Sequence, residues 1–144
     1  RFTHLFDHNK ISFYDDYAHH PTEISSVLSG VEKVYENKEI VCVFQPHRIS
    51  RVKSLKKEFS KCFKKADTVL LCPIYTANEK LRLNFTYHSF AKLIIKNSNV
   101  RLIQVEDELQ LQKFIKQNVF GEKIYIGMGA GSISNWMKNL KNIF

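Results

Sequence analysis

Residues 39–44, EIVCVF, and residues 68–72, TVLLC, decide the fold class of this chain. Both are short, nearly continuous apolar runs, which is typical of strands that are buried on both faces of a parallel sheet. Between them lies the stretch 51–65, RVKSLKKEFSKCFKK, in which apolar residues recur at helical spacing among many lysines. We therefore expect a strand, a basic helix with a solvated lysine face, and a second strand.

The same alternation extends over the rest of the chain. Two aromatic-rich runs, 3–7 and 10–15, flank a turn-forming cluster and predict an N-terminal β-hairpin. The other expected elements are a helix that begins at Pro21, a surface loop over 73–87, helices over 89–96, 107–117 and 132–143, and strands over 100–105 and 123–127. Such alternation implies right-handed crossovers. Residues 1–144 are therefore predicted to form a single α/β domain, an open and mostly parallel sheet with helices on both faces.

The composition is that of a folded domain. The chain has 144 residues, 44% of them hydrophobic, with only five Gly and three Pro, which excludes disordered and collagen-like classes. No apolar run approaches the ~20 residues of a membrane span, and the N-terminus lacks a signal-peptide core, so we expect a soluble cytoplasmic protein. The three cysteines form no CxxC pair, which favours free thiols.

The net charge of +8 makes a polyanion a possible partner. Basic residues outside 51–65 are scattered, and no RNP-type motif or zinc finger accompanies them, so a nucleotide or a small anionic substrate suits the charge as well as a nucleic acid. The chain has no P-loop and no GxSxG motif. It also begins at Arg1 rather than at a methionine, and we expect it to be a fragment of a longer protein.

The loops that follow the strands carry the candidate chemistry, because ligands bind parallel sheets at the carboxyl ends of their strands. Residues 15–21, DDYAHHP, supply two carboxylates, a phenol and two imidazoles just before a helix. The N-terminus of a helix favours the binding of an anion. The structural alternative is that Asp16 accepts backbone hydrogen bonds, Tyr17 packs, and His20 caps the helix. A metal site is not expected, because adjacent histidines rarely point the same way.

Two further loops follow buried strands. In residues 44–51, FQPHRISR, the planar fork of Arg48 suits a carboxylate or a phosphate. The alternative is a surface arginine that pairs with a neighbouring glutamate. Residues 127–131, GMGAG, match the phosphate-binding pattern GxGxxG only in part. Close packing of a helix on the sheet at a tight turn is the preferred explanation, and a phosphate site is the alternative.

The chain resembles the C-terminal domain of the Mur ligases of bacterial peptidoglycan synthesis. The resemblance rests on DDYAHHPTEI at 15–24, FQPHRISR at 44–51, CPIYTANE at 72–79 and MGAGSI at 128–133, and it covers essentially all 144 residues. It is strongest to the branch that joins L-alanine to UDP-N-acetylmuramate. The ligase that recycles murein tripeptide is a competitor, but it usually lacks the QPHR element. A free-standing nucleotide-binding α/β module and a nucleic-acid-binding domain are two further hypotheses.

The resemblance implies a Rossmann-like third domain of an enzyme whose central domain carries the P-loop. Such ligases phosphorylate the muramoyl carboxylate with ATP, and the amine of L-alanine then attacks the acyl phosphate, with Mg2+ stabilising charge. ATP and Mg2+ would be bound mainly by the missing central domain, so we expect the isolated chain to be inactive. Its expected partners are the two substrates and its own N-terminal and central domains, without nucleic acid or membrane. Cell-wall biogenesis, cell shape and cell division are the processes implied.

The resemblance also implies site residues. Asp16 and His19 are expected to be catalytic; Tyr17, His47 and Arg48 to bind substrate; and Asp16, Tyr17 and Arg1 to bind the nucleotide. No metal ligand is predicted. The chain departs from the family pattern at two places: Ile49 stands where many relatives have an aromatic residue, and residues 76–78 lack the usual acidic or Gly residues.

Overall fold

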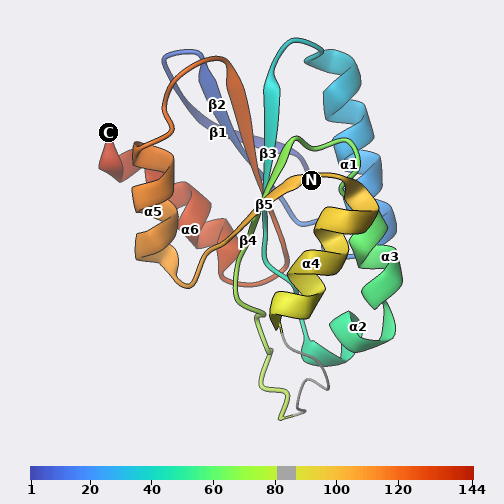
Figure 1. The fold of residues 1–144 in the computed structure, drawn as a ribbon. Coiled ribbons are helices and arrows are strands. Elements are labelled where there is room, and N and C mark those ends of the chain that lie inside the picture. Colours follow the sequence, from blue (N-terminus) through green and yellow to red (C-terminus); the bar gives the residue numbers. More distant parts are fainter. Residues whose placement is uncertain (81–86) are drawn as a thin grey trace.

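The computed structural model describes residues 1–80 and 87–144 and shows a six-stranded sheet between two layers of helices (Figure 1). The strand order is β1-β2-β6-β3-β4-β5, and all neighbours are parallel except β1 and β2, which form the predicted hairpin. The strands are β1 Thr3–His8, β2 Ile11–Asp16, β3 Glu39–Phe44, β4 Thr68–Leu71, β5 Arg101–Gln104 and β6 Lys123–Met128. The predicted fold class is confirmed.

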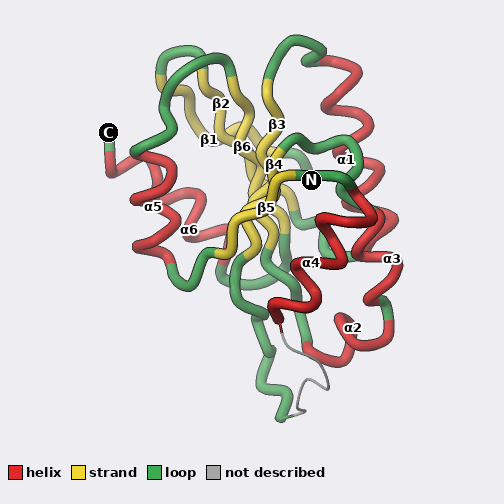
Figure 2. The backbone as a smooth tube through the Cα atoms, in the orientation of Figure 1, coloured by secondary structure: helices red, strands yellow, loops and turns green. Residues whose placement is uncertain are grey.

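The helices divide between the two faces of the sheet. They are α1 Pro21–Val34, α2 Ile49–Ser54, α3 Lys56–Lys61, α4 Tyr87–Ser98, α5 Glu108–Lys116 and α6 Ile133–Asn139, followed by the 3-10 turn η1 Leu140–Ile143. Helices α1 to α4 lie on one side, and α5 and α6 lie on the other, as the tube in Figure 2 also shows. The predicted loop over 73–87 is shorter than expected at its end, because α4 begins at Tyr87, and residues 81–86 lie outside the described residues.

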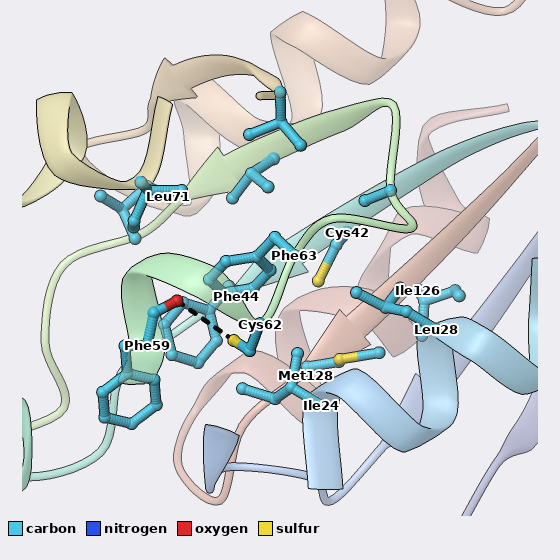
Figure 3. Packing of buried hydrophobic residues seen from close by; sticks show 14 of the residues in the cluster. Ile24, Leu28, Cys42, Phe44, Phe59, Cys62, Phe63, Leu71, Ile126 and Met128 are labelled. Atoms are coloured by element: carbon cyan, nitrogen blue, oxygen red, sulfur yellow. Dashed lines mark hydrogen bonds between the residues drawn. The ribbon is translucent and has the colours of Figure 1, made fainter. Parts of the chain in front are cut away.

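Each face of the sheet has its own apolar core. On the side of α1, α3 and α4, Phe44, Phe59 and Phe63 are fully buried with aliphatic residues of the sheet and of α1 (Figure 3). On the other side, Tyr125 and Met137 are fully buried among residues of α5, α6 and β2. Each such side chain stabilises the fold by about 1.5–3 kcal/mol relative to exposure.

All three cysteines are free, as their spacing predicted, and they are also buried. Burial raises the pKa of the Cys72 thiol to about 12 and raises the pKa of the Cys42 thiol well above its usual range. Since the thiolate is the reactive form, these thiols pack as small apolar groups and are not nucleophiles at neutral pH.

The basic segment is two short helices, so the prediction of one helix over 51–65 was wrong in that respect. The break falls at Leu55, whose φ of −116° and ψ of 22° are not helical. The hydroxyl of Ser54 donates to the carbonyl of Ser50 at 3.0 Å and lies 3.4 Å from the carbonyl oxygen of Arg51. Such hydrogen bonds from a hydroxyl to the preceding turn bend helices. Of the apolar residues at helical spacing, Val52, Phe59 and Phe63 are fully buried as expected, whereas Leu55 at the break is half-buried.

Candidate functional site

Loops that follow three parallel strands, β2, β3 and β6, meet at the carboxyl ends of the strands. In the register, Asp16 of β2 and Phe44 of β3 both stand opposite Met128 of β6, so the three strands end level with one another. Beyond these ends lies an open cleft of about 580 Å3. It is lined by Tyr17, His19, His47, Arg48, Ser50, Arg51, Ser54, Leu55 and Ala130. Four of the six predicted site residues therefore line one cleft, although they come from two loops far apart in sequence.

Asp16 is the last residue of β2, directly before the cleft residue Tyr17, and is only 5% exposed. Its Oδ1 accepts a hydrogen bond from the amide of Ala18 at 2.8 Å, which holds the turn between β2 and α1. The backbone nitrogen of Arg1 lies 3.7 Å from Oδ2. The structural alternative for Asp16 is thus correct for one carboxylate oxygen, whereas the side chain of Arg1 is exposed.

The turn after Asp16 presents His19 to the cleft and uses His20 for the helix. The Nδ1 of His20 caps α1 by accepting from the amide of Thr22, while Glu23 accepts from the amides of His19 and His20. These amide hydrogen bonds, led by that of His19, lower the pKa of Glu23. The structural alternative, in which His20 caps the helix, is confirmed for this residue.

The tautomer of neutral His19 follows from its partner. Its Nδ1 lies 2.9 Å from the carbonyl oxygen of Tyr17, which can only accept, so Nδ1 carries the proton. Its Nε2 is therefore a hydrogen-bond acceptor. Tyr17 is 63% exposed, so the alternative that it packs into the core is wrong; its ring meets that of His19 edge-on, with centroids 5.1 Å apart.

His47 has the opposite tautomer. Its Nδ1 lies 3.3 Å from a guanidinium nitrogen of Arg51, and a guanidinium only donates, so Nδ1 is the acceptor and Nε2 carries the proton. Burial and then the positive charge of Arg51 lower the pKa of His47, so the ring is neutral at neutral pH. The rings of His19 and His47 lie 5.9 Å apart, one offering an acceptor and the other a donor.

Arg48 is exposed at the rim of the cleft. Within residues 1–80 and 87–144, no carboxylate lies within ion-pair distance of its guanidinium, so the expected alternative of a glutamate partner is wrong there. Its backbone has a φ of +75°, a conformation that residues other than glycine rarely adopt. Such strain clusters at functional sites.

Sequence reasoning missed Arg51, which brings a second guanidinium to the cleft. One of its terminal nitrogens also donates to the carbonyl of His47 at 3.3 Å, which fixes its orientation. Its spacing of three residues from Arg48 and four from His47 on a helix was the available signal. The cleft therefore carries two guanidinium groups and one imidazole that donates, which is the chemistry of an anion site.

The segment after β4 supports the loop after β3. The amide of Tyr75 donates to the carbonyl of Pro46, and the amide of Arg48 donates to the carbonyl of Tyr75, both at 2.8 Å. Further along the segment, Glu79 accepts from the amide of Ser50 at 3.1 Å and from its hydroxyl. The contribution of residues 72–79 is thus to hold the neighbouring loop in place.

The glycine segment, residues 127–131, allows close packing at a tight turn, which was the explanation preferred to a phosphate site. A Cβ on Gly127 would lie 2.2 Å from Cγ of Met137, and one on Gly131 would lie 2.4 Å from Cγ of Tyr75. Gly129 has a φ of +154° and lies against the carbonyl of Gln45. The space that these glycines leave is filled by the chain's own atoms. The side chain of Gln45 adds a link from β3 to the start of α6, since its Oε1 accepts from the amide of Ile133 at 3.0 Å.

Within the part of the chain that the structure describes, no group of three or more His, Cys, Asp or Glu side chains could hold a metal ion. Among those same residues, no helix is both long enough and apolar enough to span a bilayer.

The fold and the site define a Rossmann-like α/β domain with a cationic cleft at the carboxyl ends of its parallel strands. The chain belongs to the Mur ligase family: the family model described as "Mur ligase, glutamate ligase domain" matches residues 1–131.

Relatives point to one branch of that family. The chain is 63% identical over 143 residues to the UDP-N-acetylmuramate–L-alanine ligase of Pelagibacter ubique, a match that covers 99% of this chain and 31% of that protein. The solved UDP-N-acetylmuramate–alanine ligase of Thermotoga maritima superposes with a TM-score of 0.70 at 28% identity over 99% of this chain and 29% of that one. A murein peptide ligase from Psychrobacter arcticus has the same fold, with a TM-score of 0.77 at 16% identity over 98% of this chain and 29% of that one. The chain thus spans about a third of the length of the curated relatives it matches.

Proposed function

We propose that this chain is the C-terminal domain of a three-domain, ATP-dependent ligase that joins L-alanine to UDP-N-acetylmuramate in peptidoglycan synthesis. The observation that carries the proposal is the cleft in which His19 from one loop meets His47, Arg48 and Arg51 from another. The 63% identity to a UDP-N-acetylmuramate–L-alanine ligase supports the choice of substrates. The site of action would be the cytoplasm.

The cleft has groups that match both ends of an amino acid. Arg48, Arg51 and the Nε2–H of His47 can donate to a carboxylate, and hydrogen bonds to charged groups contribute about 1.5–3 kcal/mol each. At the other end, the α-ammonium group must lose a proton before its nitrogen can attack an acyl carbon. The Nε2 of His19 is an acceptor, which suits it to take that proton. The attack forms the amide nitrogen–carbon bond and expels phosphate.

The residues at the end of β2 suit the nucleotide. Tyr17 offers an exposed aromatic face, and Asp16 directly precedes it at the end of β2. Because Oδ1 of Asp16 accepts from Ala18, the other oxygen, Oδ2, could contact a ribose hydroxyl or provide one Mg2+ ligand. When bound, Mg2+ would supply charge stabilisation on the phosphoryl oxygens. Its other ligands, and the grip on the triphosphate, are proposed to come from the central domain.

The test compares amino acceptors with the complete ligase. Phosphate release is measured with ATP and UDP-N-acetylmuramate, and with either L-alanine or murein tripeptide as the second substrate. We expect turnover with L-alanine and none with the tripeptide, while residues 1–144 alone should fold and show no turnover with either. Turnover with the tripeptide alone would assign the chain to the recycling ligase instead. Appreciable turnover by residues 1–144 would show that the chain is not a dependent domain.

A further inference from the structure

Arg48 has a backbone conformation that its own residue type does not favour. Its φ of +75° and ψ of 130° lie where a Cβ is crowded by the backbone. An exposed residue with no ion pair among the described residues would relax unless its neighbours were held on both sides. The contacts that hold residues 47 to 50 therefore decide where its side chain points.

Two contacts enclose Arg48, and both come from the segment after β4. On the near side, the amide of Arg48 donates to the carbonyl of Tyr75 at 2.8 Å, within a short parallel bridge between His47 and Tyr75. On the far side, one carboxylate oxygen of Glu79 accepts from the amide of Ser50 at 3.1 Å, and the other accepts from the hydroxyl of Ser50. The strained residue is thus spanned by a backbone contact and a carboxylate contact.

The carboxylate of Glu79 is ionised in this position. The hydroxyl of Ser50, then the amides of Ser50 and Ile49 and the charge of Arg48, lower its pKa. Glu79 itself does not line the cleft, whereas Arg48, Ser50 and Arg51 do. Glu79 therefore acts on a ligand indirectly, through its hydrogen bonds to Ser50 and its charge interaction with Arg48.

We infer that Glu79 is a positioning residue, which holds Ser50 and thereby keeps the guanidinium of Arg48 directed at the carboxylate of the amino-acid substrate. This inference rests on the proposed function. The carboxylate acts by geometry, through its two hydrogen bonds to Ser50, and its charge is secondary.

The test uses steady-state kinetics of the complete ligase with substitutions at residue 79. Glu79→Ala removes both bonds, and we expect it to raise the KM for L-alanine roughly ten- to a hundredfold, as displaced binding groups do. The KM for ATP should stay within about twofold. Glu79→Gln keeps an acceptor for the amide and a donor for the hydroxyl, so it should remain near wild type. Glu58→Ala, an exposed acid on α3, is the matched control for the change in charge.

A double-mutant cycle with Arg48→Ala separates positioning from general damage. If Glu79 acts through Arg48, adding Glu79→Ala to Arg48→Ala raises the KM for L-alanine no further. Independent effects that multiply, or equal rises for ATP and L-alanine, would overturn the inference, as would a Glu79→Gln variant as impaired as Glu79→Ala. Should Glu79→Ala fail to fold, Ser50→Ala removes only the hydroxyl hydrogen bond to Glu79. It must then show a smaller rise in the KM for L-alanine, again without a rise in the KM for ATP. If Arg48→Ala itself leaves the KM for L-alanine unchanged, the proposed function and this inference both fail.

Discussion

The ring of Tyr75 stacks on the imidazole of His47, with centroids 5.4 Å apart and planes inclined by 14°. Tyr75 also fills the space that Gly131 leaves free, so it connects the loops after β3, β4 and β6. Because Tyr75 is 40% exposed, this contact contributes more to the shape of the cleft than to the stability of the core.

Gly131→Ala should therefore impair the site more than the fold. Its Cβ would lie 2.4 Å from Cγ of Tyr75, which displaces the ring that supports His47. We expect kcat/KM for L-alanine to fall by roughly tenfold or more, with a loss of stability below about 1.5 kcal/mol. Kinetics and urea unfolding of the same protein make the comparison. A drop in stability without any change in kcat/KM would show that Tyr75 does not shape the cleft.

Gly127→Ala should do the reverse. Its Cβ would lie 2.2 Å from Cγ of Met137, a fully buried residue, so we expect the free energy of unfolding to fall by about 1–3 kcal/mol. Gly30→Ala is the matched control, because nothing lies within 4 Å of its added Cβ in α1 and alanine stabilises helix interiors by about 0.5–1 kcal/mol. Urea unfolding measures both. Equal stability of the two variants would contradict the packing explanation of the glycine segment.

Asp16 should separate into two roles when its variants are compared. Asp16→Ala removes the acceptor for the amide of Ala18 and should lower the free energy of unfolding by about 1–3 kcal/mol. Asp16→Asn keeps an oxygen for that amide and removes the charge, so its stability should remain near wild type while kcat falls. Thermal melting and phosphate-release kinetics on both variants test this. A fully active Asp16→Asn enzyme would mean that the carboxylate is only structural.

Stability should fall in mild acid because of His47. Its pKa is lowered from 6.5 by burial and the neighbouring cations, so the unfolded chain binds the proton more readily than the folded one. This contribution is therefore lost as the pH falls through about 6.5 toward the lower folded value. Urea midpoints at pH 7.5 and 5.5 should show a larger loss for wild type than for His47→Gln. Identical losses would assign the pH dependence to other groups.

The parts of the fold that follow from local pattern were predictable. The nearly continuous apolar runs of β3 and β4 predict buried parallel strands on their own, Pro21 marks the start of α1, and the DDYAHHP loop concentrates polar groups in one place. The break at Leu55 was not predictable, because it is associated with a hydrogen bond from the hydroxyl of Ser54 to the carbonyl of Ser50 in the preceding turn. The helical spacing of apolar residues among lysines does not indicate whether this hydrogen bond forms.

The candidate site was predictable where its residues share a loop, and less so where tertiary contacts complete it. Tyr17, His19, His47 and Arg48 were identified and do meet in one cleft. Arg51 was missed because it begins the basic stretch 51–65, whose charged residues were assigned to a solvated helix face. Tyr75 and Glu79 act across β3 and β4, and only the parallel register brings them to His47 and Ser50.

The central claim, that the cationic cleft receives the carboxylate of L-alanine, is tested most directly by Arg48→Ala in the complete ligase. Steady-state kinetics are measured with each substrate varied in turn. Loss of a charge-assisted contact of about 1.5–3 kcal/mol predicts a rise of roughly ten- to a hundredfold in the KM for L-alanine, with little change for ATP. Arg48→Lys should recover only part of this, since an ammonium cannot make two parallel bonds. A rise in the KM for ATP with that for L-alanine unchanged would make Arg48 a phosphate ligand and contradict the account.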